Sequence, residues 1–244
     1  MKKIGTDDFG QHEVVHTASI IVDMISSHIM EHPAVEANPR WTHLAEKALE
    51  AMMAVYQETA TNTALRQMLK ELIIEKSFRK GNFTLASGKA SNYFFDMKPT
   101  MLDPSGSNLI GTLILDKITE ISVDHRANVV GGMAMGAIPL VSVVSSKSHQ
   151  TNFPVKGFFV RKQAKDHGTE QIIEGELFEG DRVICLEDVT TSGGSVMIAI
   201  NAARATGCCV DNAITIVDRL EGAEAFLQAV GVTLHSIFTI EDFA

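Results

Sequence analysis

A polar segment in the second half of the chain carries acids, hydroxyls and glycines in an order suited to an anionic ligand. The apolar run 183–186 is followed by Glu187 and Asp188, and residues 190–195 read Thr-Thr-Ser-Gly-Gly-Ser. Glycines let the backbone approach a ligand, and free N–H groups at a helix start attract a phosphate. Acids at a strand's carboxyl end can hold sugar hydroxyls or the water shell of Mg²⁺. The alternative is an ordinary turn with Asp188 as helix cap, but two acids directly before this loop favour the ligand site.

A cluster of basic residues lies upstream, in a chain whose net charge is −9. Residues 161–169 read Arg-Lys-Gln-Ala-Lys-Asp-His-Gly-Thr. Arginine can grip a phosphate with two hydrogen bonds and lysine supplies a mobile charge, so the cluster suits a pyrophosphate leaving group. Gly168 and Gly175 bracket a polar stretch that could move as a lid. The alternative is a solvated charge run without function.

Residues 83–98 mix aromatic side chains with Ser, Gly and Lys. An aromatic ring can stack on a flat heterocycle, and Lys or backbone N–H groups can receive a carboxylate. Alternate strand residues face opposite sides, so at least one of Tyr93 and Phe95 belongs to the core, and we expect Phe94 to face the ligand. The glycine-rich segment 131–139 follows a strand, starts a helix and can present backbone amides to pyrophosphate.

Taken together, these motifs resemble the type I phosphoribosyltransferases and, among them, the orotate phosphoribosyltransferases. Segment 187–195 is similar to the ribose-phosphate signature, and segment 161–168 resembles the orotate enzymes' catalytic loop almost letter for letter. The segment from Phe83 resembles their orotate-binding motif, and segment 217–222 resembles their Asp-Arg-x-Glu-Gly motif. The resemblance covers residues 63–240. It implies transfer of phosphoribose from phosphoribosyl pyrophosphate (PRPP) to orotate, yielding orotidine 5′-monophosphate and pyrophosphate for UMP synthesis.

The resemblance also implies site residues and a cofactor. Lys165, Arg161, His167 and Asp188 would be catalytic. Mg²⁺ would bind through PRPP and water near Glu187 and Asp188, with no direct protein ligand expected. The implied PRPP-binding set is Arg161, Lys162, Lys165, His167, Glu187, Asp188, Thr191, Ser192, Gly193, Gly194 and Ser195. The implied orotate-binding set is Lys89, Phe94, Phe95, Thr191 and Arg219.

Three positions depart from the family pattern. Glu187 stands where Asp is commoner, and Gly136 stands where some members have Lys. Many bacterial members carry Arg-Lys where this chain has Lys89-Ala90, so Lys89 or Lys98 is expected to take over the missing contact. An isolated strand-end Arg219 would otherwise be read as a surface ion pair.

The elements that must position these residues follow from apolar periodicity. Stripes over 14–29 and 41–55 predict two helices of an N-terminal extension, 1–62, and a third stripe over 65–73 opens the phosphoribosyltransferase domain, 63–244. Beyond it, strands alternate with helices, which predicts an α/β fold with a mostly parallel central sheet covered on both faces. The resemblance adds a small hood. Strands are expected at 93–95, 128–131, 155–160, 182–187, 213–218 and 233–238, and helices at 105–120, 135–147, 194–206 and 221–230.

The amino-acid composition limits the classes of partner and the cellular locations that we expect. The acidic net charge disfavours nucleic acid, three cysteines form a poor disulfide framework, and no apolar run approaches a membrane span, so we expect a soluble cytoplasmic protein. The resemblance implies a homodimer in which the lid loop reaches the partner's site, and the N-terminal helices would cap the fold or enlarge the dimer interface. Alternatives are a transferase for another base and a non-catalytic PRPP sensor. The intact Lys165-Asp166-His167 loop argues against the sensor.

Overall fold

The computed structural model describes residues 8–84, 90–122, 127–151, 153–162 and 172–243. The chain divides into two compact units, Met1–Gln67 and Met68–Ala244. Within the described ranges, no helix is long and apolar enough to cross a membrane.

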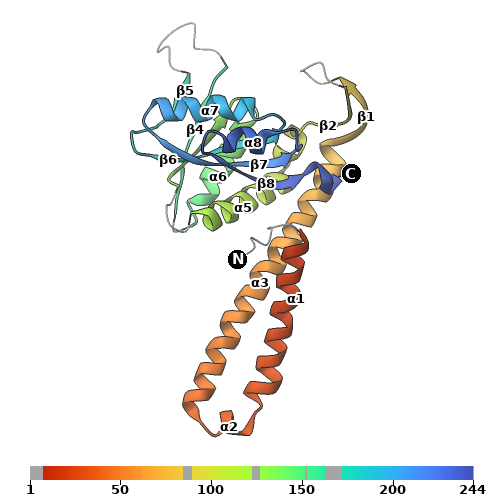
Figure 1. The fold of residues 1–244 in the computed structure, drawn as a ribbon, viewed down its shortest axis with the longest axis vertical. Helices are drawn as coiled ribbons and strands as arrows, with labels where there is room; N and C mark the ends of the chain where they lie inside the picture. The colour runs from red at the N-terminus through yellow and green to blue at the C-terminus, as the bar shows by residue number, and fades with distance from the viewer. Residues whose placement is uncertain (1–7, 85–89, 123–126, 152, 163–171, 244) are drawn as a thin grey trace. The chain divides into compact units, whose positions relative to one another are not determined.

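The first unit is a helical hairpin (Figure 1). Its elements are α1 (Asp8–Met24), the π-helical turn η1 (Ile25–Met30), α2 (Pro33–Glu36) and the first part of α3 (Pro39–Lys76). The stripes over 41–55 and 65–73 predict separate helices before and after residues 61–63, but α3 runs through this stretch. Hydroxyls in this stretch bond back to the preceding turn, as in the 3.0 Å bond from Thr63 Oγ1 to the Thr59 carbonyl, so they do not interrupt the helix.

The unit boundary lies inside α3, at Gln67 and Met68. The predicted domain boundary between residues 62 and 63 therefore stays a prediction. The last two turns of α3 belong to the second unit, where Leu69 and Ile73 are fully buried. By contrast Trp41 and Leu44, on the apolar stripe that predicts the second N-terminal helix, are 52% and 55% exposed.

The second unit contains a six-stranded sheet with the order β5-β4-β3-β6-β7-β8. All neighbouring pairs are parallel except β4 and β5, which are antiparallel. The predicted mostly parallel sheet is thus confirmed. Its strands are β3 (Val129–Met133), β4 (Lys156–Val160), β5 (Ile173–Gly175), β6 (Arg182–Thr190), β7 (Cys209–Asp218) and β8 (Thr233–Thr239).

Helices cover both faces of this sheet, with α7 and α8 on one and α5 and α6 on the other (Figure 1). Asp103 starts α5 because its carboxylate accepts the N–H groups of Ser105 and Gly106, at 2.9 and 3.0 Å. Two-sided burial explains why the central strands are almost continuously apolar. The helices are α5 (Pro104–Ile121), α6 (Ala137–Ser148), α7 (Gly194–Ala205) and α8 (Ala223–Gln228).

A separate antiparallel pair, β1 (Phe78–Thr84) and β2 (Ala90–Phe95), forms the small hood. It is followed by the short helix α4 (Lys98–Met101). Phe95 packs against Phe243 of the C-terminal turn η2 (Ile240–Phe243), with ring centroids 5.2 Å apart. The hood is therefore anchored by an aromatic cluster rather than by pairing with the main sheet.

Gly132 lies where β3 packs closely against the backbone of β6. A Cβ there would lie 2.2 Å from the Leu186 carbonyl oxygen and 2.5 Å from the Ala137 Cβ. Because backbone cannot yield without shifting β6, we expect Gly132→Ala to lower the free energy of unfolding by about 2–3 kcal/mol in urea denaturation. Gly194→Ala is the control, since its Cβ would meet only Ser192 Oγ, at 4.0 Å. A similar loss in both variants would contradict the packing argument.

Candidate active site

The strand order reverses between β3 and β6. From β3 the chain crosses through α6 to β4 on one side, and from β6 through α7 to β7 on the other. Open α/β sheets bind their ligands in the crevice outside the carboxyl ends of strands at such a point. A Cβ at Gly136 would lie 2.7 Å from Asp188 Oδ1. The structure therefore brings the predicted pyrophosphate loop after β3 next to the predicted ribose-phosphate loop after β6.

This contact also bears on one departure from the family pattern. Any side chain at position 136 would have to displace the Asp188 carboxylate, because its Cβ would already be too close. Lys98 instead lies near this carboxylate. The raised pKa of Lys98 reflects mainly its hydrogen bond to Asp96, whose Oδ1 is 2.5 Å from Nζ, with a further contribution from the charge of Asp188. The structure thus places a cation near the acids in the absence of a lysine at 136.

The two acids at the end of β6 are largely buried. Glu187 is only 7% exposed, and burial, followed by the charge of Asp188, raises its pKa to about 8. Burial also raises the pKa of Asp188, although its Oδ1 accepts the Val189 N–H at 2.9 Å. Strongly shifted acids in a cleft are typical of functional sites.

Three buried polar atoms of this region lack a hydrogen-bond partner within the described residues. They are Glu187 Oε2, Thr190 Oγ1 and Arg219 Nε. The Arg219 N–H donates to the Thr190 carbonyl at 2.9 Å, so the ends of β6 and β7 are adjacent. An unsatisfied buried polar group costs about 1–3 kcal/mol, so a cluster of them calls for a ligand or water. These atoms mark the carboxyl edge of the sheet as the site.

The start of α7 can receive an anion. Gly193, its N-cap, has a φ of +84°, a left-handed conformation that favours glycine, and no side chain caps the helix by a hydrogen bond. Its first N–H groups are thus available to a ligand. Gly194 faces open space, and the neighbouring Ser192 and Ser195 are exposed. Thr191, predicted to contact both substrates, is half-buried in the same loop.

Arg219, which directly follows β7, is only 7% exposed. Its Nη2 lies 2.8 Å from Glu221 Oε1 and donates to Ser91 Oγ at 3.2 Å, which connects β7 with the hood. Phe94 is 42% exposed, whereas Phe95 is buried in the aromatic cluster, and the predicted contacts of both residues with orotate stay predictions. The sequence analysis did not identify the contact of Ser91 with Arg219 or the unpartnered hydroxyl of Thr190. The Ser-x-Tyr pattern at residues 91–93 is the signal that could have pointed to Ser91.

The described contacts do not place several of the predicted residues in the site. Lys89, Lys165 and His167 lie outside the described residues. Lys162 is exposed, and Arg161 pairs with Glu174 of β5 at 3.2 Å. Their roles in binding pyrophosphate or orotate stay predictions.

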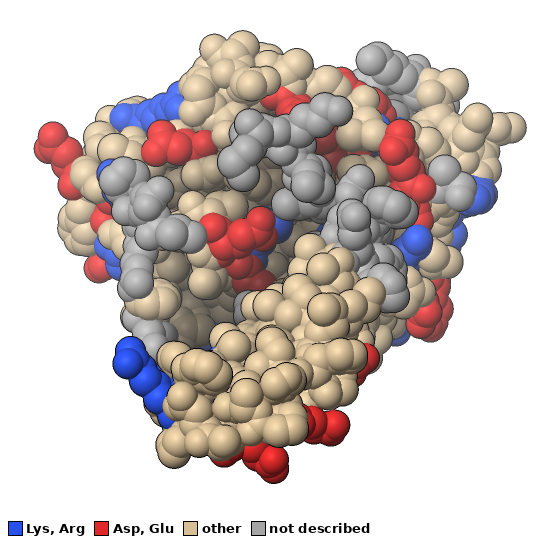
Figure 2. Space-filling model, turned by 60° about the horizontal axis from the view of Figure 1, so that its bottom comes forward, with Lys and Arg blue, Asp and Glu red and all other residues tan. Residues whose placement is uncertain are grey.

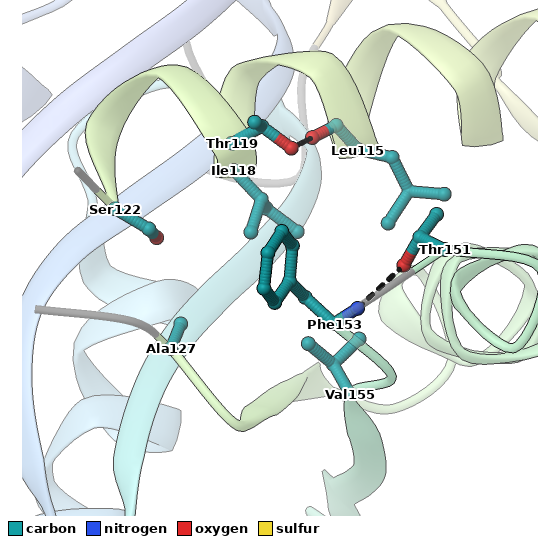
Figure 3. Close-up of a pocket in the computed structure, with 8 residues that line it drawn as sticks. All are labelled: Leu115, Ile118, Thr119, Ser122, Ala127, Thr151, Phe153 and Val155. Carbon is teal, nitrogen blue, oxygen red and sulfur yellow. Dashed lines mark hydrogen bonds between the residues drawn. The ribbon is translucent and has the colours of Figure 1, made fainter.

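Two hollows lie at the opposite, amino edge of the sheet. The first, about 260 Å³, is mostly apolar (Figure 3). The second, about 410 Å³, lies near the start of β6 and β7. Neither contains the orphaned polar atoms or the glycine loops. The residues lining the first hollow are Leu115, Ile118, Thr119, Ser122, Ala127, Thr151, Phe153 and Val155.

The charge distribution favours a local anion site over a basic surface. On the face drawn in Figure 2, Lys and Arg of the described chain occur in small separate groups among acidic and uncharged residues. The net charge of the whole chain is −9. A phosphate must therefore be held by backbone amides and a few nearby cations.

Glu187→Gln tests the cost of burying this acid. Burial raises the pKa of Glu187 from its ordinary 4.5 to about 8, so between these pH values the folded state keeps a proton that the unfolded state has lost. The contribution of this group to the free energy of unfolding is therefore largest below pH 4.5 and is lost as pH rises through 8. Glutamine cannot ionise. We expect thermal melting of Glu187→Gln to match the wild type near pH 4.5 and to occur at least about 5 °C higher at pH 9. A pH-independent difference would show that burial does not shift this group.

A mostly parallel sheet with two acids and an uncapped, glycine-rich helix start at its switch point, beside a separate two-stranded hood, defines the type I phosphoribosyltransferase class. Consistent with this, an orotate phosphoribosyltransferase of Rhodopseudomonas palustris (strain BisB18) is 39% identical over 187 residues, which are 75% of this chain and 98% of the relative. The chain belongs to the orotate phosphoribosyltransferase family.

Other comparisons agree with this assignment, although no family model matches the chain. An orotate phosphoribosyltransferase of Nostoc sp. (strain PCC 7120) is 39% identical over 193 residues, covering 79% of this chain and 91% of the relative. The crystal structure of Mycobacterium tuberculosis orotate phosphoribosyltransferase with PRPP matches with a TM-score of 0.58 at 29% identity, covering 74% of this chain and 92% of that one. The expected fold is confirmed.

Proposed function

We propose that this protein transfers the 5-phosphoribosyl group of PRPP to orotate, releasing pyrophosphate and forming orotidine 5′-monophosphate in pyrimidine synthesis. The observation that carries the proposal is the convergence of Glu187, Asp188 and the α7 start on one strand edge, with Arg219 beside them. The crystal structure of the M. tuberculosis relative holds PRPP. A similar sugar phosphate fits the acids and amides described above.

The reaction needs no protein nucleophile. Loss of pyrophosphate leaves a cationic, oxocarbenium-like ribose, which the orotate nitrogen captures. Glu187 and Asp188 are proposed to hold the ribose hydroxyls, and the loop 191–195 to hold the 5′-phosphate. Arg161, Lys162, Lys165 and His167 are proposed to stabilise the leaving pyrophosphate, and Arg219 to bind the orotate carboxylate.

The residues present suit a magnesium ion held through water. Glu187 and Asp188 offer carboxylate oxygens, the ligand type that Mg²⁺ prefers, and Glu187 Oε2 is buried without a partner in the described structure. When bound with PRPP, Mg²⁺ would neutralise negative charge on the departing pyrophosphate.

We further propose a homodimer in which segment 161–169 serves the partner's site, and a cytoplasmic location. Both proposals follow from the family resemblance. Sedimentation of the purified chain measures the assembly. If Lys165→Ala and Arg219→Leu chains are mixed, a dimer with shared sites should regain part of the activity that each lacks alone.

The deciding assay follows orotate absorbance with PRPP and Mg²⁺. We expect orotate to be consumed and pyrophosphate released in equal amounts. Transfer to uracil or a purine, with none to orotate, would indicate the alternative base. PRPP binding without turnover of any base would indicate a sensor.

A further inference from the structure

The buried guanidinium of Arg219 is held from the hood strand β2. Its Cζ lies 4.8 Å from the centre of the Tyr93 ring, and its Nη2 donates to Ser91 Oγ at 3.2 Å. Arg219 is only 7% exposed. A buried charge is costly unless it is paired, so these contacts determine where the guanidinium can lie.

Ser91 is a fixed hydrogen-bond acceptor for this arginine. Its Oγ donates to the Tyr93 carbonyl at 2.7 Å and accepts the Tyr93 N–H at 3.3 Å. A serine hydroxyl has one hydrogen to donate and two lone pairs. With the hydrogen directed to the Tyr93 carbonyl, one lone pair receives Tyr93 N–H and the other receives Nη2 of Arg219. The hydroxyl is thereby fully used, and it cannot rotate without losing a bond.

The Tyr93 ring is also held in place. It lies edge-on to Phe95, with centroids 6.2 Å apart, and tilted against Phe78 at 6.5 Å. These two rings belong to the buried aromatic cluster that anchors the hood. A cation over a fixed aromatic face is attracted by the ring quadrupole, and the attraction is stronger when the pair is shielded from water. The contact uses the ring and not the phenol oxygen.

The described contacts leave one buried donor of Arg219 without a partner. Both hydrogens of Nη2 are accounted for by Ser91 and Glu221, whereas Nε is buried and has no partner in the described part of the chain. We propose that Tyr93 and Ser91 are positioning residues that hold the Arg219 guanidinium for the carboxylate of the substrate. This inference rests on the proposed function, because it deepens the account of how that site selects orotate.

Tyr93→Leu tests the proposal. Loss of the ring should raise KM for orotate about tenfold, corresponding to about 1.4 kcal/mol of a buried cation–π contact, and change KM for PRPP less than twofold. Tyr93→Phe keeps the ring and should stay within about twofold of the wild type in both constants. Ser91→Ala, a second and milder variant, should raise KM for orotate about threefold. Binding of uracil, which lacks the carboxylate, should be unchanged in all three.

A matched control and a double variant complete the design. Tyr56, the other tyrosine of the chain, lies on the α3 part of the helical hairpin, and Tyr56→Leu should leave both KM values unchanged. If Tyr93 acts through Arg219, the pair Tyr93→Leu and Arg219→Leu should be no worse for orotate than Arg219→Leu alone.

The outcomes separate this inference from the proposed function. Absence of orotate turnover in the wild type would overturn both. Turnover in the wild type, together with equal changes in both KM values for Tyr93→Leu or additive losses in the double variant, would overturn the positioning role alone. A Tyr93→Phe variant as impaired as Tyr93→Leu would also overturn it, because the ring would then not be the group that matters.

Discussion

Replacing Arg219 with leucine should lower kcat/KM for orotate by about 10²–10³-fold, equivalent to about 3–4 kcal/mol for lost hydrogen bonds to a carboxylate. The change also leaves the bound carboxylate in a low-dielectric site without its cation. KM for PRPP should change little, because the described side-chain contacts of Arg219 are with Ser91 of the hood and with Glu221, not with the loop before α7. Steady-state kinetics with each substrate varied in turn makes the measurement.

Two further variants show whether the effect is specific to the Arg219 guanidinium. Arg219→Lys keeps the charge but loses the planar fork, so about one tenth of the wild-type value should return. Arg40→Leu removes an exposed arginine from α3 and should have no effect. A loss shared equally by orotate and PRPP would point to misfolding of the strand end, and full activity of Arg219→Leu would remove this residue from the base site.

The double variant Glu187→Gln/Asp188→Asn should reduce kcat/KM for PRPP by about 10³-fold, since each acid is expected to contribute about 2 kcal/mol through charged hydrogen bonds to ribose or to the water around Mg²⁺. The amides match the carboxyl groups in shape. We therefore expect the double variant to fold. It also removes the free-energy cost of burying two acids.

The control for this pair is Asp211→Asn. Asp211 is an exposed acid of β7, near the amino edge of the sheet, so its loss should not change PRPP kinetics. The measurement is PRPP-dependent pyrophosphate release at saturating orotate, with circular dichroism to check folding. Retention of more than a tenth of wild-type kcat/KM by the double variant would exclude the acids from the ribose site.

Much of this fold could be predicted from local sequence. Strand β6 could be recognised because an apolar run ends abruptly in Glu187 and Asp188, and α7 because glycines precede a helical stripe. The strand order could not be read from one sequence. It depends on which strand lies beside β6, and that neighbour proved to be β3, far away in the chain.

Side-chain contacts across the fold were harder to predict. Nothing in the spacing of Ser91 and Arg219 reveals that they touch, because they lie 128 residues apart and meet only through tertiary packing. The exposure of the α3 stripe could not be predicted for a related reason. Helical periodicity identified an apolar face, but periodicity cannot tell whether that face packs within the chain, and Trp41 is half exposed.

The continuity of α3 has a consequence for how the helical hairpin becomes ordered. Starting a helix is the unfavourable step, whereas extending one residue at a time is nearly free once a first turn exists. The turns around Leu69 and Ile73 are fixed by the core of the second unit, so they provide such a first turn without further cost. Order in the long helix can then spread backwards along the chain toward Pro39, so folding of the second unit favours ordering of the N-terminal segment.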